Sequence, residues 1–288
     1  MLTLIGTFSP HDINTAGVVA GNTTVYNDAS LWVDHPCTWS SGALIEMPTL
    51  GGYNGQAMAI NAAGRVAGQS FLTDNKTLRA CVWINGTPHD LSSLAGTTTS
   101  KSAATDLNDN GQVVGWSDTA AGVPHATLFQ IDANGAVLSR TDLGVLGSTN
   151  SYAHGVNNAG MVVGVSDGRA FKWQTGTMTD LNTTIASSSG WTISNAAAIN
   201  DAGVIVGEGI RYGFGRAIML TPASCLKADV NNNGSVDGAD VALFASVLMS
   251  GGSAQQTCAS DVAAPADGVV NLTDVNAFVQ CLLNGGCG

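Results

Sequence analysis

Ile60-Asn61-Ala62-Ala63-Gly64-Arg65-Val66-Ala67-Gly68 is one of five copies of the pattern Ile-Asn-x-x-Gly-x-Val-x-Gly. Every copy keeps the Asn, the Gly three residues later and the Gly seven residues later. The five asparagines are Asn14, Asn61, Asn108, Asn157 and Asn200, spaced 47, 47, 49 and 43 residues apart. Such regularity indicates one supersecondary unit that is copied five times.

The pattern predicts a β-hairpin. An apolar residue ends one strand, the Asn caps the turn with its side-chain oxygen, and the first Gly takes the left-handed conformation. Apolar pairs such as Val113-Val114 then begin the next strand. The second Gly is expected to let a neighbouring backbone approach closely.

Two more strands are expected in each unit. A third strand is represented by Ala80-Cys81-Val82-Trp83, and a fourth by Asp142-Leu143-Gly144-Val145-Leu146-Gly147. Four short strands in roughly 46 residues are typical of a β-propeller blade. The fifth unit ends at Leu220 without a fourth strand, whereas residues 2–8 match the missing segment.

The fold that we expect is therefore mainly β, a five-bladed propeller of four-stranded repeats closed by the N-terminal strand. Closure would remove two free sheet edges at once. The alternative is an open β-solenoid, which leaves those edges exposed. A small α-helical domain with paired calcium loops is expected to follow the propeller.

Composition excludes several classes of protein. Only 11% of the residues are charged, and 10 Lys+Arg against 21 Asp+Glu give a net charge of −11. Nucleic acid is excluded as a partner because no cationic cluster is present. Membrane insertion is excluded because no apolar run approaches the roughly 18 residues of a spanning helix.

The repeats resemble the HAF repeats of bacterial extracellular proteins. The resemblance covers about residues 1–220 and rests on the Asn-x-x-Gly hairpin and on the Asp-Leu-Gly-x-Leu-Gly strand. Parts of the His-Ala-Phe triplet remain in His125-Ala126 and Ala170-Phe171. The resemblance implies a secreted repeat domain.

The C-terminal segment carries a twelve-residue loop with oxygen-bearing residues at calcium-ligand spacing. It runs from Asp229 to Asp240, with Gly234 at position 6 and Asp in place of Glu at position 12. Oxygens at positions 1, 3, 5, 7, 9 and 12 suit Ca²⁺, which takes six to eight oxygen ligands. The expected ligands are Asp229, Asn231, Asn233, Ser235, Asp237 and Asp240. Val236 at position 8 is expected to pair with its counterpart in a second loop.

The second loop is related to the first by the offset that separates Asp240 from Asp274, and it departs from the pattern. Ala263 and Pro265 stand at positions 1 and 3, where they cannot bind a cation through a side chain. A second calcium ion is therefore the weaker prediction. Its expected ligands are Asp267, Val269, Asn271 and Asp274, with Asp261 reaching the ion only through a local bulge. Each loop precedes an amphipathic helix that ends at Gly, beginning at Asp240 and at Asp274.

A duplicated calcium loop and helix without an entering helix resembles a type I dockerin. The resemblance covers residues 225–288 and implies attachment to a cohesin-like protein domain, often in extracellular polysaccharide degradation. Dockerins often carry a Ser-Thr pair at loop positions 10 and 11, where this chain has Gly238-Ala239 and Leu272-Thr273. The docking role is therefore implied without a particular partner.

We divide the chain into a repeat propeller at 1–221, a linker at 222–224 and a dockerin-like domain at 225–288. Six Cys favour a disulfide-using, extracellular compartment, although residues 1–6 do not form a signal peptide. The true start is expected upstream, or a presequence has been removed; a cytosolic protein with reduced thiols is the alternative. The four C-terminal cysteines allow three pairings, of which we favour Cys225–Cys287 and Cys258–Cys281.

The acidic, histidine and cysteine residues of the propeller are expected to have structural roles. Glycoside hydrolysis needs two carboxylates, and Asp12 and Asp106 occupy one repeat position. The other acidic residues near the hairpins are Asp109 and Asp201. Four histidines (His11, His35, His125 and His154) occupy repeat positions and His89 lies alone, so the histidines show no metal-ligand spacing. Cys37 and Cys81 share one slot in consecutive units and are expected to be buried thiols.

The tryptophans divide into two groups. Trp39, Trp83 and Trp173 are expected in the core, whereas Trp32, Trp116 and Trp191 lie outside that repeat position and could stack on sugars. The sequence thus predicts a secreted, non-catalytic protein. Its C-terminal domain is expected to attach it to a partner protein in a calcium-dependent manner. The alternative is a glycoside hydrolase or a carbohydrate-binding protein that uses the propeller face.

Overall fold

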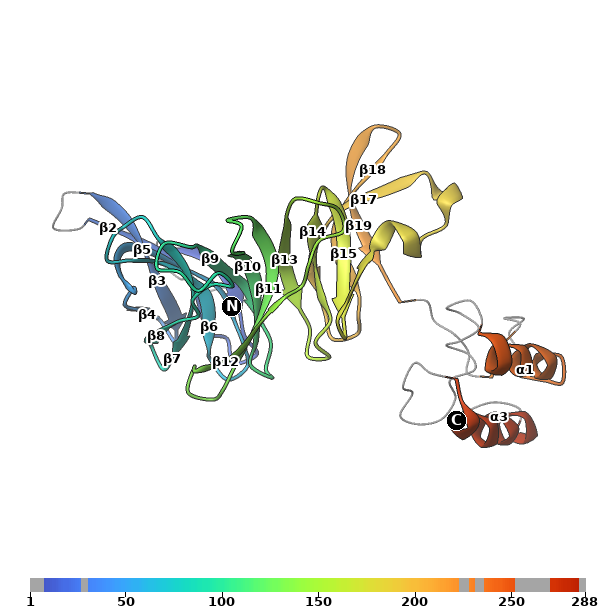
Figure 1. Cartoon of the computed structure of the whole chain (residues 1–288). Coiled ribbons are helices and arrows are strands. Elements are labelled where there is room, and N and C mark those ends of the chain that lie inside the picture. Colours follow the sequence, from blue (N-terminus) through green and yellow to red (C-terminus); the bar gives the residue numbers. More distant parts are fainter. Residues whose placement is uncertain (1–7, 27–30, 223–227, 231–235, 252–269, 285–288) are drawn as a thin grey trace. The chain divides into compact units, whose positions relative to one another are not determined.

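The computed structural model describes residues 8–26, 31–222, 228–230, 236–251 and 270–284. The chain divides into two compact units, Met1–Thr221 and Pro222–Gly288. Unit 1 is built of β-strands with two short 3-10 helices, and the described part of unit 2 contains two α-helices (Figure 1). The predicted closing strand at residues 2–8 lies almost entirely outside the described residues.

Unit 1 consists of five antiparallel sheets, each of which is a meander of consecutive strands. Sheet 1 contains β1 (Ser9–Ile13), β2 (Val19–Tyr26), β3 (Trp32–Ser40) and β4 (Ala43–Glu46). Sheet 2 contains β5 (Gly51–Ile60), β6 (Val66–Leu72), β7 (Leu78–Ile84) and β8 (Thr87–Asp90). Sheet 3 contains β9 (Ser102–Leu107), β10 (Gln112–Asp118), β11 (Pro124–Ile131) and β12 (Val137–Asp142).

Sheet 4 contains β13 (Ser151–Val156), β14 (Val162–Ser166), β15 (Arg169–Gln174) and β16 (Thr177–Asp180). The 3-10 helices η1 (Leu181–Thr184) and η2 (Ser187–Ser189) lead to sheet 5, which contains β17 (Trp191–Ile199), β18 (Ile205–Arg211) and β19 (Phe214–Leu220). Four sheets have the expected four strands, but the fourth strand of sheet 3 ends at Asp142, so the predicted segment Asp142–Gly147 lies almost entirely in the loop that follows it. Among the described residues sheet 5 has three strands, and β19 ends at Leu220, where the sequence predicts that the fifth unit ends.

The Asn-x-x-Gly segments form the turns between the first and second strands. In the first copy the Asn14 side-chain oxygen accepts hydrogen bonds from the N–H groups of Ala16, 3.1 Å away, and Val18, 3.0 Å away. Gly17 has φ 76°, in the left-handed region that favours glycine. The first Gly of every other copy also lies between 74° and 77°. The hairpin chemistry predicted from the sequence is confirmed.

The second Gly of each copy makes room for the backbone of the first strand. A Cβ atom on Gly68 would collide with the carbonyl oxygen of Gln56 on the neighbouring β5. The second glycines of the other four copies lie equally close to a carbonyl oxygen of their own first strands. The close backbone approach that the repeat predicts is therefore present in all five sheets.

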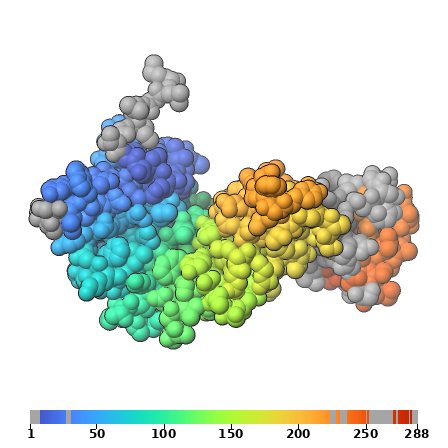
Figure 2. All heavy atoms as spheres, turned by 90° about the horizontal axis from the view of Figure 1, so that it is seen from above, coloured from blue at the N-terminus to red at the C-terminus, as the bar shows by residue number. Residues whose placement is uncertain are grey.

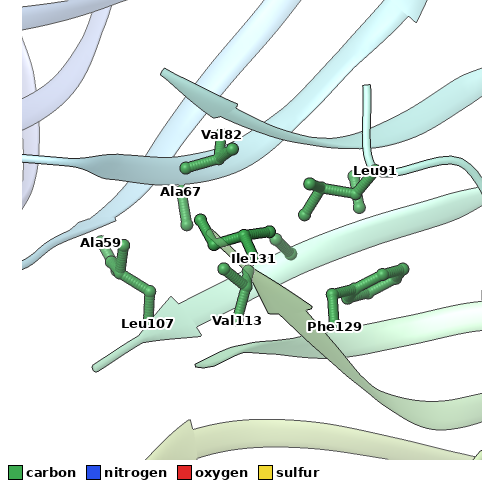
Figure 3. Close-up of a cluster of buried hydrophobic side chains, with 10 residues drawn as sticks. Ala59, Ala67, Val82, Leu91, Leu107, Val113, Phe129 and Ile131 are labelled. Carbon is green, nitrogen blue, oxygen red and sulfur yellow. The ribbon is translucent and has the colours of Figure 1, made fainter. Parts of the chain in front are cut away.

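The core of unit 1 lies between successive sheets. Sheet 2 contributes Ala67, Val82 and Leu91 to a cluster that sheet 3 completes with Val113 and Phe129 (Figure 3). Similar clusters join sheets 1 and 2, sheets 3 and 4, and sheets 4 and 5. In Figure 2 the colours of the sheets follow one another in sequence order around an arc. Each sheet is therefore stabilised by burying apolar side chains against its neighbours in the chain.

No corresponding cluster joins sheet 5 to sheet 1 among the residues that the structure describes. Val206 of sheet 5 is 43% exposed, whereas its counterparts in the other four sheets are fully buried. Ile13 of sheet 1 is 62% exposed, whereas its counterpart Leu107 in sheet 3 is 6% exposed. Sheets 1 and 5 thus each expose apolar residues whose equivalents in other sheets of unit 1 are buried.

The expectation that three tryptophans fill the core is wrong for two of them. Trp83 is 1% exposed in the cluster between sheets 1 and 2. Trp173 is half-buried at the edge of the cluster between sheets 3 and 4. Trp39 pairs with Val19 just as Trp83 pairs with Val66, but Trp39 is half-buried because no sheet precedes sheet 1 among the described residues to cover that face.

In unit 2, α1 (Asp240–Ser250) and α3 (Leu272–Asn284) are the helices expected after the two loops. Phe244 and Phe278, which occupy equivalent places in the two halves, stack with ring centroids 3.9 Å apart. Val236 and Val270, the residues at position 8 of the two loops, both pack against the same buried cluster. The sequence duplication in this unit is therefore also a structural repeat.

Candidate functional site

The five hairpin turns of unit 1 meet around a shared cavity of about 440 Å³. Its lining comes from the Asn turns of all five sheets. The side-chain nitrogen of Asn14 donates to the carbonyl oxygen of Asn61 at 3.1 Å, and Asn61 donates to Asn108 at 3.1 Å. Asn108 donates in the same way to Asn157, and Asn157 to Asn200. This asparagine ladder gives the repeat Asn a second structural role beyond the turn.

The acidic pair that could have carried hydrolysis also links neighbouring sheets. Asp12 accepts the N–H groups of Ile13 and Ile60, one on each carboxylate oxygen, at 2.8 and 2.7 Å. Asp106 accepts those of Leu107 and Val156 in the same arrangement, both at 2.8 Å. Each carboxylate therefore uses both oxygens to tie its own sheet to the next one.

The pKa of the Asp106 carboxyl is raised to about 7. Burial disfavours its charged form, and the nearby negative charge of Asp12 raises the pKa further. A raised pKa occurs in catalytic acids and also in buried structural carboxyls. The paired backbone donors at Asp106 favour the structural role.

Asp109 and Asp201 lie at the outer rim of the same cavity. The Asn158 side chain bridges them, with its amide nitrogen 3.3 Å from Asp109 Oδ2 and 3.0 Å from Asp201 Oδ2. Their other oxygens accept backbone N–H groups of neighbouring turns. The four acidic residues are thus brought to one end of the sheets, where each makes hydrogen bonds between turns.

The histidines also make hydrogen bonds within the repeat. His11 Nδ1 lies 2.7 Å from the carbonyl oxygen of Ala57, and His154 Nδ1 lies 3.0 Å from that of Ala196. Both contacts join one sheet to the next. Among the described residues no group of three or more His, Cys, Asp or Glu side chains could hold a metal ion.

Cys37 and Cys81 are buried free thiols, as expected. Burial raises the pKa of the Cys37 thiol to about 11, and it also raises the pKa of Cys81. Both side chains are therefore in the neutral thiol form at neutral pH and behave as small apolar core residues.

The first predicted calcium loop is described in part. Asp229 at position 1 is 3% exposed and Asp240 at position 12 is fully buried. Asp240 Oδ2 accepts the backbone N–H of Asp237 at 3.0 Å, which joins positions 12 and 9 of the loop. The other predicted ligands, Asn231, Asn233 and Ser235, lie outside the described residues.

The second loop repeats this arrangement where it is described. Asp274 is 1% exposed, and its Oδ2 atom accepts the backbone N–H of Asn271 at 3.0 Å. Asn271 and Asp274 stand at positions 9 and 12, the positions that Asp237 and Asp240 hold in the first loop. The predicted ligands Asp261, Asp267 and Val269 lie outside the described residues.

The donor set of the first loop suits a hard divalent cation. Its two terminal carboxylates are buried, and burial of a carboxylate costs free energy unless a cation or several donors compensate it. Unit 2 has six Asp against a single basic residue, Lys227. Oxygen donors in this spacing with little competing positive charge fit Ca²⁺.

Cys281 is buried in the core of unit 2 and is disulfide-bonded. Its expected partner Cys258 lies outside the described residues, as do Cys225 and Cys287. The two pairings stay predictions.

The structure places the three remaining tryptophans near the sheet ends opposite the Asn turns. Trp32 is 73% exposed and packs against Tyr26 with ring centroids 5.1 Å apart. Trp116 is half-buried against Tyr152. Trp191 is half-buried beside Arg211.

Sequence reasoning missed the residues around Trp191. Arg211, Tyr212, Phe214 and Arg216 gather on the hairpin between β18 and β19. The one sequence signal was Tyr212-Gly213 at a position where a tight turn favours Asn-Gly or Asp-Gly.

Comparison with known proteins identifies a family similarity without a function. Residues 50–176 match the family described as protein of unknown function (DUF3466). This match covers sheets 2 and 3 and most of sheet 4. No curated protein matches the chain.

Similar solved structures were found at low sequence identity. TolB from Acinetobacter baumannii has 14% identity and a TM-score of 0.45, covering 74% of this chain and 51% of its own. The β-propeller domain of the Trilobed protease from Pyrococcus furiosus has 13% identity and a TM-score of 0.40, covering 77% and 83%. The extracellular domain of a putative one-component system from B. thetaiotaomicron has 11% identity and a TM-score of 0.44, covering 79% and 30%. The chain thus spans about half the length of TolB.

The helices in the described part of the chain are too short or too polar to cross a membrane.

Proposed function

We propose that this chain is a secreted, non-catalytic protein in which a calcium-dependent dockerin-type unit attaches a HAF-type repeat unit to a cohesin-like partner. Unit 2 supplies the attachment, and unit 1 supplies a binding or scaffolding surface, with extracellular polysaccharide degradation as the setting. The proposal combines the sequence resemblances with the geometry of the two units.

The observation that carries the attachment role is the internal repeat of unit 2. Two loop ends, each with a buried Asp at position 12 that accepts the N–H of position 9, precede two helices. The helices meet through Phe244 and Phe278, which are themselves equivalent residues of the two halves. A paired loop and helix of this kind presents two equivalent helix surfaces to a partner.

Calcium would supply positive charge to the oxygen cluster and hold the loop ends in place. The residues that would hold it are Asp229, Asn231, Asn233, Ser235, Asp237 and Asp240. The second loop would use Asp267, Val269, Asn271 and Asp274, with Asp261 as a further donor. A unit of about 65 residues buries a small core, so bound metal is expected to contribute directly to its folding free energy.

Calorimetry of the full chain with Ca²⁺ and with EDTA tests the proposal. Chelation is expected to lower the unfolding temperature of unit 2 and to leave that of unit 1 unchanged. Asp240→Asn is expected to weaken Ca²⁺ binding about tenfold or more. The matched control is Asn276→Ala, an exposed position on α3 that is expected to bind Ca²⁺ as the wild type does. Calorimetric curves that EDTA does not change would overturn the calcium role.

The docking step has its own test. A pull-down with the full chain is expected to recover a cohesin-like domain in Ca²⁺ and to lose it in EDTA. If the chain binds Ca²⁺ but recovers no such domain under either condition, the calcium site stands and the cohesin-like partner is ruled out.

For unit 1 we propose a five-bladed propeller that residues 2–8 complete at the free edge of β19. The five Asn turns around one cavity support a common axis. The exposed faces of sheets 1 and 5 carry the residues that are buried between the other sheets.

A carbohydrate-binding role for unit 1 is the second candidate, and the exposed aromatic side chains at the sheet ends favour it. A glycoside hydrolase is the less favoured alternative because Asp12 and Asp106 bind backbone N–H groups with both oxygens. Incubation with a polysaccharide panel separates these roles. Binding without release of reducing ends is expected, and turnover that Asp106→Asn abolishes would establish the enzyme.

A further inference from the structure

The hairpin between β18 and β19 carries a compact group of aromatic and arginine side chains. We name Trp191, Arg211, Tyr212, Phe214 and Arg216 the sheet 5 platform. Arg211 lies opposite Trp191 on β17 and opposite Phe214 on β19. Directly opposed residues of an antiparallel sheet project from the same face, so these three side chains form one row.

The rings hold the guanidinium groups in place. Arg211 Cζ lies 5.5 Å from the centroid of the Trp191 ring and 5.1 Å from that of Tyr212. Arg216 Cζ lies 5.4 Å from the centroid of Phe214. These three distances, between guanidinium groups and aromatic rings, are typical of cation–π contacts. Such contacts hold the arginine side chains in place through the ring faces and do not require their N–H donors. Tyr212 is 81% exposed and Phe214 is 62% exposed, so the rings are open to a ligand.

The turn that presents Tyr212 is strained. Tyr212 has φ 53° and the next residue, Gly213, has φ 78°. A bulky side chain rarely adopts a positive φ, and an observed outlier of this kind is a reason to consider function. The equivalent turn of sheet 4, between β14 and β15, has Asp167-Gly168. Turns with the same two positive φ angles between third and fourth strands also place a small polar residue before Gly: Ser41-Gly42, Asn85-Gly86 and Thr175-Gly176. An aromatic ring is thus kept at a turn whose backbone favours Asn.

Arg216 lacks the carboxylate that its repeat position has in the other sheets. In each four-stranded sheet a basic residue near the start of the third strand pairs with an acid at the end of the fourth. These pairs are His35–Glu46, Arg79–Asp90, His125–Asp142 and Arg169–Asp180. Sheet 5 places Arg216 at this position, and residues 1–7 contain no Asp or Glu to serve as its partner.

Arg211 adds a second positive charge a few residues away. Neither it nor Arg216 belongs to the ion pairs found among the described residues. In a chain with a net charge of −11, Arg211 and Arg216 bring two positive charges to one hairpin. A ligand with carboxylates would complement them, because the guanidinium fork suits a carboxylate.

We propose that the sheet 5 platform binds a polysaccharide that contains uronic acids. Tyr212 and Phe214 offer flat faces for the apolar C–H surface of pyranose rings, and Arg211 and Arg216 bind the sugar carboxylates. The inference deepens the proposed function, since it gives the repeat unit a ligand of stated chemistry. It does not involve the calcium loops.

Affinity electrophoresis and titration calorimetry of the full chain with polygalacturonate oligosaccharides test the proposal. Binding is expected for the wild type and is expected to weaken as salt rises. Tyr212→Ala, Arg211→Gln and Arg216→Gln are each expected to weaken binding about tenfold. Arg216→Lys keeps the charge without the fork and is expected to fall between Arg216→Gln and the wild type.

The matched controls are Lys76→Gln, which removes one positive charge elsewhere on unit 1, and Leu138→Ala, which removes an apolar side chain that is 65% exposed. Both are expected to bind as the wild type does. Circular dichroism confirms that each variant is folded. Two results would overturn the assignment to acidic sugars. If neutral cello-oligosaccharides bind as tightly as polygalacturonate, the carboxylates are not recognised. If a poly-aspartate peptide binds as tightly, the sugar rings are not recognised.

Measuring the same binding in Ca²⁺ and in EDTA separates this proposal from the attachment role. Sugar binding that persists in EDTA while the cohesin-like partner is lost assigns the two ligands to different units. Sugar binding that platform variants leave unchanged overturns the platform, whatever happens to docking.

Discussion

At the scale of single residues, the repeat Asn combines two tasks. Its side-chain oxygen accepts the N–H groups of its own turn, and its amide nitrogen donates to the carbonyl of the next turn. Asn61 does both, through Arg65 N at 3.0 Å and Asn108 O at 3.1 Å, and is only 5% exposed. A buried group that loses its partner costs more than the bond itself contributed.

Asn61→Ala is therefore expected to lower the free energy of unfolding of unit 1 by about 2 kcal/mol. Urea denaturation followed by tryptophan fluorescence measures the change. Thr15→Ala, at an exposed neighbouring repeat position, is the control and is expected to change stability by less than about 0.5 kcal/mol. Equal stabilities for the two variants would show that the ladder does not stabilise the unit.

The raised pKa of Asp106 predicts that the free energy of unfolding depends on pH. Its folded-state pKa of about 7 exceeds the ordinary value of 3.8, so the folded chain holds a proton that the unfolded chain releases between these values. The free energy of unfolding is therefore expected to fall by about 1 to 4 kcal/mol as pH rises from about 4 to about 7. Asp106→Asn removes the titration and is expected to flatten this slope.

Denaturation curves at several pH values measure the slope. Thr15→Ala, an exposed position that lines the same cavity and makes no hydrogen bond to a carboxylate among the described residues, is expected to keep the wild-type slope. A slope that Asp106→Asn leaves unaltered would mean that folding does not raise the pKa of Asp106.

At the scale of strands and turns, the two glycines of the repeat act through different physics. A Cβ atom on Gly64 would meet nothing within 4 Å, but its φ of 77° disfavours any other residue. A Cβ atom on Gly68 would collide with the Gln56 carbonyl on the adjacent strand. The first glycine is required by backbone conformation and the second by space.

Gly68→Ala is therefore expected to cost about 3 kcal/mol or more, because the two strands must separate. Gly64→Ala, its matched control in the same hairpin, is expected to cost about 1 to 2 kcal/mol. Thermal unfolding of both variants checks the order. A larger loss for Gly64→Ala would contradict the close-approach role of Gly68.

Many of the strands, turns and helices could be predicted from the sequence, because the conformation of a turn depends on a few neighbouring residues. The Asn-x-x-Gly turns, the missing fourth strand after Leu220 and the helices after Asp240 and Asp274 follow from short patterns. The sheet 5 platform could not be predicted in this way. Arg211, Tyr212 and Arg216 break no hydrophobic period, and only strand pairing brings Arg211 opposite both Trp191 and Phe214.

The hydrogen bonds between neighbouring sheets could not be predicted from the sequence either. Asp12 and Asp106 share a repeat position, which suggested a catalytic pair as readily as a structural one. Their hydrogen bonds to Ile60 and Val156, each in the following sheet, depend on how the sheets stack. The burial of Trp39 likewise depends on whether another sheet covers it, and no local pattern records that.

At the scale of the whole chain, removal of residues 1–7 tests the proposed fourth strand of sheet 5. The truncation is expected to lower the melting temperature of unit 1, by about 2–4 °C for each kcal/mol lost in a unit of this size. Removal of residues 285–288 is the control and is expected to leave unit 1 unaffected. An unchanged melting temperature after removal of residues 1–7 would favour an open arrangement of the sheets.

The asparagine ladder has a direction: each of the first four turns gives a hydrogen bond to the turn that follows it in the chain. Because the same atoms meet at each junction, any unit is chemically interchangeable with any other at that point. A chain lengthened or shortened by one whole unit would need no new recognition chemistry along the ladder. Growth of the chain by tandem copying would therefore leave the bonding between neighbouring turns unchanged.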